Sequence, residues 1–165
     1  MPTNSSIILE HPLRYGITFD PVAYVVESAD GRRGFRAPAS SKCPKLYVFS
    51  RSGHLIYIGQ TVQAMGTRLR QGMTASGESG YHGYAWRHDR QSVDLDVWVV
   101  SASNGCCVDP KELESIECEV VHAYRSRHGQ WPLHQTEIHF RQIQPIHTHL
   151  AKVIMDHYSG ERKDQ

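Results

Sequence analysis

Residues 46–70 constrain the fold of this chain more than any other segment. Residues 46–50 and 55–58 are two short runs of apolar, β-branched and aromatic side chains, separated by three residues that end in Gly53. Such runs form strands, and a short connection with glycine between two of them is typical of a β-hairpin. Gly59 allows the chain to leave the second strand, and we expect a helix after it. The segment therefore predicts a hairpin followed by a helix.

Each of these strands carries a tyrosine, Tyr47 in the first and Tyr57 in the second. Side chains alternate faces along a strand, so tyrosines on paired strands can share a face and bring their hydroxyls together. Arg68 and Arg70 follow on the expected helix. Phenols beside guanidinium groups suit a phosphate group. The plainer interpretation is that tyrosines are common in strands and arginines on solvated helix faces, and composition alone favours it.

The order of these residues favours a site. Tyr-Ile-Gly at 57–59 begins ten residues after Tyr47, and Arg68 comes eleven residues after Tyr57. In this order and spacing the segment resembles the GIY-YIG nuclease family, in which a GIY strand, a YIG strand and a helical arginine form half of the active site. The first motif departs from the family, because Lys-Leu-Tyr at 45–47 stands in place of Gly-Ile-Tyr.

The resemblance covers roughly residues 43–140 and implies a small α/β domain with a three-stranded antiparallel sheet flanked by helices. Residues 1–42 would be an N-terminal extension, in which the Asp-Gly turn at 30–31 predicts a second hairpin. Alternating side chains at 93–100 predict the third strand of the sheet. Residues 1 to about 20 show no clear period, and we expect them to be partly disordered or draped over the domain.

Residues 141–165 predict a C-terminal helix and tail packed on the same domain. The helix is expected to begin near Pro145. His147 and His149 lie two positions apart, so they point in different directions on a helix. We expect both histidines at the surface.

A further helix is predicted to begin at Asp109-Pro110 and to end before Gly129. Asp109 is typical of an N-cap, proline of the first helical position and glycine of a helix end. Its apolar face consists of Leu113, Ile116, Val120, Val121 and Tyr124. Glu117 falls in the middle of that face. A buried carboxylate is costly unless it is paired, hydrogen-bonded or bound to a cation, so Glu117 requires a partner.

The resemblance implies that this glutamate binds a divalent metal ion, Mg²⁺ or Mn²⁺. Residues 117–121 fit the family's pattern of a glutamate, two further residues and then two apolar residues. Glu119 is the fallback, because a helix boundary predicted from sequence can shift by about one or two residues.

The resemblance also implies roles for the remaining site residues. Tyr47, with Tyr57, would accept the proton of the attacking water, and Arg68 would bind the phosphate. His82 is a second candidate for the base, and Arg70 is a supporting residue.

The family closes its site with an asparagine soon after a proline. Here Pro132 is followed by His134 and Gln135 and by no asparagine. Either of these two side chains could supply the missing polar contact.

The charges are divided between two parts of the chain, although the net charge is only +1. No acid occurs between Asp30 and Glu78, an interval with eight basic residues, whereas residues 93–119 hold seven acids and one lysine. The basic part could lie along phosphates and the acidic part could hold a metal ion. The expected contacts to nucleic acid are Lys45, Arg51, Arg68 and Arg70.

The length of 165 residues suits one domain, and 39% hydrophobic and 21% charged residues are typical of a soluble globular protein. No apolar run reaches 18 residues and no secretory signal is visible, so we expect a cytoplasmic protein without a membrane span. The four cysteines show no CxxC spacing, and we expect them to be reduced.

The function implied by the resemblance is hydrolysis of phosphodiester bonds in nucleic acid, for which we expect DNA. One alternative is a nucleic-acid-binding module of the same fold that has lost turnover, and another is a chance motif match on an unrelated fold. Oligomeric state, sequence specificity and biological role stay open.

Overall fold

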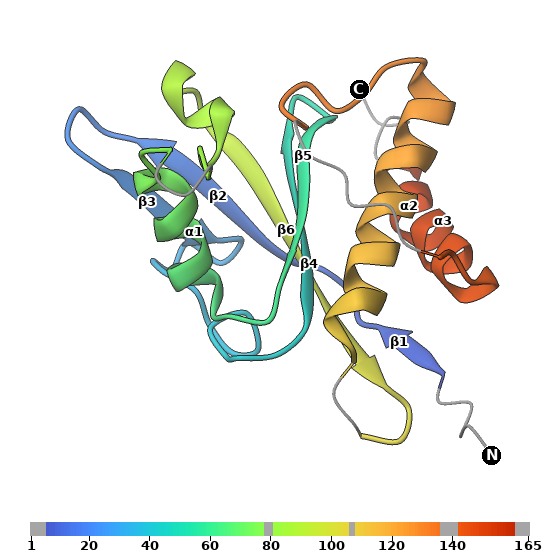
Figure 1. The fold of residues 1–165 in the computed structure, drawn as a ribbon. Coiled ribbons are helices and arrows are strands. Elements are labelled where there is room, and N and C mark those ends of the chain that lie inside the picture. The colour runs from blue at the N-terminus through green and yellow to red at the C-terminus, as the bar shows by residue number, and fades with distance from the viewer. Residues whose placement is uncertain (1–5, 78–80, 106–107, 136–141, 161–165) are drawn as a thin grey trace.

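The computed structural model describes residues 6–77, 81–105, 108–135 and 142–160. These residues form an α/β fold with a six-stranded antiparallel sheet and three α-helices (Figure 1). The strands are β1 (Ile7–Leu9), β2 (Leu13–Phe19), β3 (Tyr24–Ser28), β4 (Lys45–Arg51), β5 (His54–Thr61) and β6 (Val93–Ala102). The helices are α1 (Met65–Thr74), α2 (Pro110–His128) and α3 (Pro145–Gly160), and a short 3₁₀ helix spans Ala85–Asp89.

The sheet has six strands among the described residues, not the three expected. Its order is β3-β2-β6-β4-β5, and β1 also pairs with β6. The three expected strands, β4, β5 and β6, form one half of the sheet. β6 lies in the centre of the sheet, and most of its side chains are therefore buried.

The other half of the sheet comes from the N-terminal segment, for which only the hairpin around residues 30–31 was expected. β1 and β2 both pair with β6, so residues 7–19 belong to the sheet and are not draped over it. β3 pairs with β2, and only one bridge, between Glu27 and Arg33, remains of the hairpin expected around the Asp-Gly turn. The N-terminal segment is thus part of the same sheet as the central hairpin.

Helices cover both faces of the sheet, as Figure 1 shows with α1 on one side and α2 and α3 on the other. The apolar face of α2 is buried as predicted, and Ile116 and Val120 pack in one core with Leu46 and Ile58 of the hairpin. A second core on the α1 side is largely aromatic. Its aromatic members include Tyr15, Tyr47, Phe49, Tyr84 and Trp86. Alternate side chains of β4 enter different cores, as expected for a central strand.

The ends of α2 follow the predicted signals. The Asp109 carboxylate accepts a hydrogen bond from the Lys111 amide, and Gly129 ends the helix with a φ of 73°.

The Glu112 carboxylate contacts His147 of α3, whose ring also accepts from the Gln144 amide. His147 is therefore buried between two helices, and our expectation of a surface position was wrong.

None of the helices among the described residues is both long enough and apolar enough to cross a membrane. Cys43 and Cys118 are free thiols. The remaining two cysteines, at 106 and 107, lie outside the described residues.

Candidate functional site

Tyr47 and Tyr57 lie on the same face of the β4–β5 hairpin. Tyr47 pairs with Gly59 and Phe49 with Tyr57, so the two tyrosines are diagonal neighbours. Their rings are stacked, with centroids 6.2 Å apart and an angle of 25° between the planes. A Cβ atom on Gly59 would lie 2.5 Å from both Cζ and Oη of Tyr47. The glycine of the Tyr-Ile-Gly motif thus makes room for the ring on the facing strand.

Arg68 points from α1 towards these rings. Its Nε donates a hydrogen bond of 2.8 Å to the hydroxyl oxygen of Tyr47. The guanidinium carbon lies 5.9 Å from the ring centroids of Tyr47 and Tyr84 and 5.3 Å from that of Tyr81. Aromatic rings attract a cation at such distances. The guanidinium is thereby held among three phenols while part of the side chain stays accessible.

Tyr84 and Tyr81 belong to this cluster, although the sequence did not assign them to the site. The hydroxyls of Tyr84 and Tyr47 share a hydrogen bond of 3.3 Å, and the Tyr84 amide donates to the Gly72 carbonyl at 3.0 Å. A Cβ on Gly72 would lie 2.1 Å from the Tyr84 ring, so this helical glycine provides the space for it. Glycines next to aromatic residues at 80–84 were the available signal, but only packing determines which ring turns inward.

Burial controls the protonation of the phenols. It raises the pKa of Tyr47 well above the usual value, Tyr84 raises that pKa further, and Arg68 opposes the shift only in part. Burial likewise raises the pKa of Tyr57, with Tyr47 and then Glu117 adding to the shift. Both hydroxyls are therefore protonated at neutral pH in the free protein.

Glu117 is half-buried on α2, which covers the opposite face of the sheet from α1. Its carboxylate nevertheless contributes to the raised pKa of Tyr57, on the edge strand β5, so it lies within electrostatic reach of that hydroxyl. Glu119 points elsewhere and accepts a hydrogen bond of 2.8 Å from Thr148 of α3. Of the two candidate glutamates, Glu117 is the one placed near the tyrosines.

Three of the expected basic contacts lie apart from this cluster. The Lys45 side chain is buried, and its ammonium donates to the carbonyl oxygens of Ser41 and Cys43 at 2.7 and 2.6 Å, so Lys45 is not available to nucleic acid. Burial lowers the pKa of this ammonium.

Arg51 is also engaged, in a two-bond pair with Asp89 at 2.9 and 3.1 Å. Arg70 is exposed, and its charge partly offsets the rise that burial causes in the pKa of Tyr24 on β3. It lies two residues from Arg68, a spacing that turns the two arginines to different sides of α1. Lys45 and Arg51 are thus bonded to other groups of the protein, whereas Arg68 lies in the tyrosine cluster.

His134 and Gln135 border the edge of β5. The His134 amide donates to the Ile56 carbonyl at 2.8 Å, and the Gln135 side-chain oxygen accepts from the Ile58 amide at 2.9 Å. Burial lowers the pKa of the His134 imidazole, which lies near the Arg51–Asp89 pair. His134 and Gln135 thus bond the two residues of β5 that flank Tyr57.

His82 is exposed, as expected, and its ring lies against the backbone at Gly77, where a Cβ would be 2.8 Å from Cε1.

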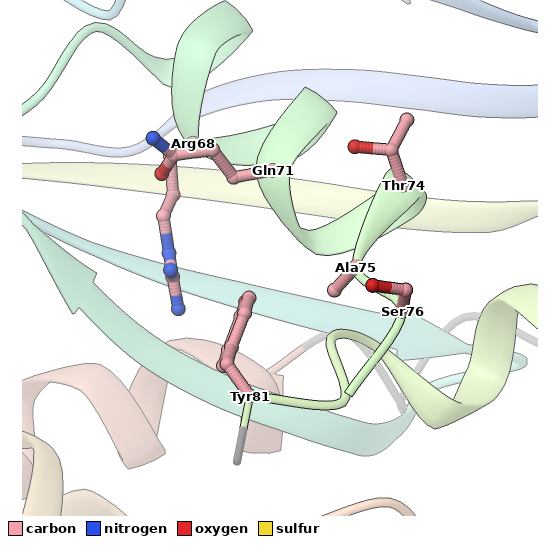
Figure 2. Close-up of a pocket in the computed structure, with 6 residues that line it drawn as sticks. All are labelled: Arg68, Gln71, Thr74, Ala75, Ser76 and Tyr81. Carbon is pink, nitrogen blue, oxygen red and sulfur yellow. The ribbon is translucent and has the colours of Figure 1, made fainter. Parts of the chain in front are cut away.

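An open pocket of about 340 Å³ adjoins Arg68 (Figure 2). The pocket is lined by Arg68, Gln71, Thr74, Ala75, Ser76 and Tyr81. Figure 2 shows the Arg68 side chain extending from α1 and the Tyr81 ring rising towards it from the loop below. Glu117 is not among the lining residues.

No family model, curated protein or solved structure matches this chain.

The chemistry available at the cluster is that of anion binding beside a single carboxylate. Arg68 supplies a fixed cation, and the charges of Arg68 and Glu117 both act on the pKa of Tyr57. Among the described residues, no group of three or more His, Cys, Asp or Glu side chains is placed to hold a metal ion. Any metal here would depend on one carboxylate, with water and substrate oxygens as its other ligands.

Proposed function

We propose that this protein is a metal-dependent endonuclease that hydrolyses phosphodiester bonds in nucleic acid, with DNA as the expected substrate. The observation that carries the proposal is the Arg68 guanidinium held by the Tyr47 hydroxyl, beside a second phenol, Tyr57, whose pKa the Glu117 carboxylate helps to raise. The order and spacing of these residues resemble the GIY-YIG nuclease family. In this proposal the hairpin, α1 and α2 correspond to that family's core elements.

Arg68 would bind the non-bridging oxygens of the scissile phosphate. A guanidinium has a planar set of donors that matches phosphate, and it stays charged at any working pH. Its Nε is already bonded to Tyr47, so the terminal nitrogens are the groups left for the substrate. A cation held in place before the substrate arrives stabilises developing negative charge without reorganisation.

Glu117 would hold Mg²⁺ or Mn²⁺. One carboxylate beside a hydroxyl is compatible with Mg²⁺, which keeps several water ligands and is commonly bound through one or two carboxylates and substrate phosphates. The bound ion would neutralise charge on the leaving oxygen. Glu119 is engaged by Thr148, so we assign the role to Glu117.

A tyrosine would accept the proton of the attacking water. We assign this role to Tyr57, because the Glu117 charge acts on its pKa, whereas the Tyr47 oxygen is occupied by Arg68 and Tyr84. The raised pKa of Tyr57 means that this phenol must lose its own proton first. We therefore expect the rate of cleavage to rise with pH above neutrality, by roughly tenfold per pH unit while the phenol stays mostly protonated.

The same raised pKa values favour a second candidate function, a nucleic-acid-binding module without turnover. Two protonated phenols can donate hydrogen bonds to a phosphate but cannot accept a proton from water. Arg68 would then serve binding alone.

Incubation of supercoiled plasmid with the purified protein, in Mg²⁺ and in chelator, separates these functions. The nuclease proposal expects Mg²⁺-dependent nicking, a loss of at least about a hundredfold for Glu117→Gln, and a near wild-type rate for the matched control Glu119→Gln. Equal trace rates for the wild type and Glu117→Gln would reject the enzyme. Retention of plasmid on a gel without cutting would support the binding module.

A further inference from the structure

The pocket beside Arg68 differs in chemistry from the tyrosine cluster that it adjoins. Gln71 and Thr74 follow Arg68 by three and six residues, so the three side chains lie along one side of α1. Apart from Arg68, the lining side chains are uncharged. The pocket therefore offers one cation at one end and a neutral, polar surface beyond it.

Gln71 provides the most specific group on that surface. Its side chain is exposed and makes no hydrogen bond to another described residue, whereas the Thr74 hydroxyl already donates to the Arg70 carbonyl at 2.9 Å. A free carboxamide presents one acceptor and one donor group side by side. This pair is complementary to the edge of adenine, which presents N6 as donor and N7 as acceptor.

Tyr81 provides a second unused group. Its hydroxyl oxygen is buried and has no hydrogen-bond partner among the described residues, while its ring centroid lies 5.3 Å from the Arg68 guanidinium. A buried hydroxyl without a partner is costly, and such a group in a native structure commonly meets a ligand or water. A phosphate bound to Arg68 would bring acceptor oxygens to this donor.

We propose that this pocket binds one nucleotide of the substrate, with its phosphate on Arg68 and Tyr81 and its base against Gln71, and that it prefers adenine. The inference rests on the proposed function, because this nucleotide would be the one that carries the scissile phosphate. Arg68 alone would suffice for inorganic phosphate, but the neutral remainder of the pocket suits a flat, polar base. Gln71 is then a specificity-determining residue.

Isothermal titration calorimetry with three small probes tests the inference without relying on cleavage. We expect adenosine 5′-monophosphate to bind at least about fivefold more tightly than inosine 5′-monophosphate, which has an acceptor in place of the N6 donor, and at least about tenfold more tightly than inorganic phosphate. Equal affinity for all three, or no binding of any of them, would overturn the nucleotide pocket.

Two variants separate the roles of the pocket residues. Gln71→Ala should remove the preference for adenine over hypoxanthine, whereas Gln91→Ala, which changes an exposed glutamine before β6, should keep it. Tyr81→Phe should weaken all three probes by about tenfold, because each carries a phosphate that would lose the same donor. An adenine preference that survives Gln71→Ala would overturn the assignment of the base.

The plasmid assay and the probe titration fail independently. Nicking without any preference for adenosine monophosphate would leave the nuclease in place and reject the pocket. Binding of that nucleotide through Gln71 without nicking would support the pocket and reject the nuclease.

Discussion

The Nε of Arg68 donates a hydrogen bond of 2.8 Å to the hydroxyl oxygen of Tyr47. A phenol on a strand thereby fixes the direction of a guanidinium on the following helix. The Tyr47 ring is fully buried, so its hydroxyl is better suited to holding Arg68 than to reaching a water molecule. This contact separates the two tyrosines into a positioning residue, Tyr47, and a residue nearer to Glu117, Tyr57.

Replacing Tyr47 by phenylalanine tests the positioning role. Tyr47→Phe keeps the ring and removes only the hydroxyl, so we expect a loss of about 1.5–3 kcal/mol in the free energy of unfolding, the value for a hydrogen bond to a charged group. Nicking should fall by at least about tenfold, since a misplaced catalytic group costs rate steeply. Urea unfolding and the plasmid assay measure the two effects. Tyr24→Phe, on β3 away from Arg68, is the control, and an unchanged nicking rate in Tyr47→Phe would contradict the role.

Two glycines of α1 predict opposite effects of the same substitution. Gly72 lies against the Tyr84 ring, where a Cβ would be 2.1 Å from the nearest ring atom, whereas a Cβ on Gly66 would meet Phe35 at an ordinary 3.7 Å. We expect Gly66→Ala to stabilise the protein by up to about 1 kcal/mol through helix propensity. Gly72→Ala should destabilise it by about 1–3 kcal/mol because the ring must move. Denaturant unfolding compares the two, and similar values would contradict the packing of Tyr84.

The buried phenols predict a loss of stability in alkali. Burial raises the pKa of Tyr47, Tyr57, Tyr84 and Tyr158 above their value in the unfolded chain. The folded state therefore holds more protons than the unfolded state above a pH of about 10, and stability falls as pH rises from there. Below that pH the contribution is fully present. Tyrosinate absorbance should show that some of the eight tyrosines ionise only when the protein unfolds. A single unshifted titration of all eight would contradict the prediction.

A buried carboxylate links the sheet to α3. Asp96 of β6 accepts from Tyr158 at 3.0 Å and from Arg14 of β2 at 2.9 and 3.1 Å. We expect Asp96→Ala to cost about 2–4 kcal/mol, less than a fully buried pair because the Arg14 side chain is 43% exposed. A double-mutant cycle with Tyr158→Phe should give a coupling energy of about 0.5–3 kcal/mol. A coupling near zero would show that the Tyr158 bond contributes nothing.

Local patterns predicted the elements that carry the candidate site. The β4–β5 hairpin, α2 with Asp109 at its start and Gly129 at its end, and the beginning of α3 all follow from signals within a few residues. Such signals depend on backbone preference and on burial of a local apolar face, which the sequence expresses directly.

The N-terminal half of the sheet was missed for a physical reason. β1 and β2 are short, and their stability comes from pairing with β6, more than 70 residues later in the chain. Pairing between distant segments depends on contacts that no local pattern contains. The burial of Lys45 and His147 was missed likewise, because each is stabilised by acceptors that only the folded chain brings within reach.

The sequence by itself determined that two tyrosines, an arginine and a glutamate occur in a given order on a hairpin and two helices. The tertiary structure decided which of them interact: Arg68 bonds Tyr47, and the Glu117 charge helps to raise the pKa of Tyr57. It also added Tyr81 and Tyr84 to the cluster. Arg51 instead pairs with Asp89. The physical reason is that side-chain direction and desolvation depend on the packing of distant elements, whereas element type depends mainly on local preference.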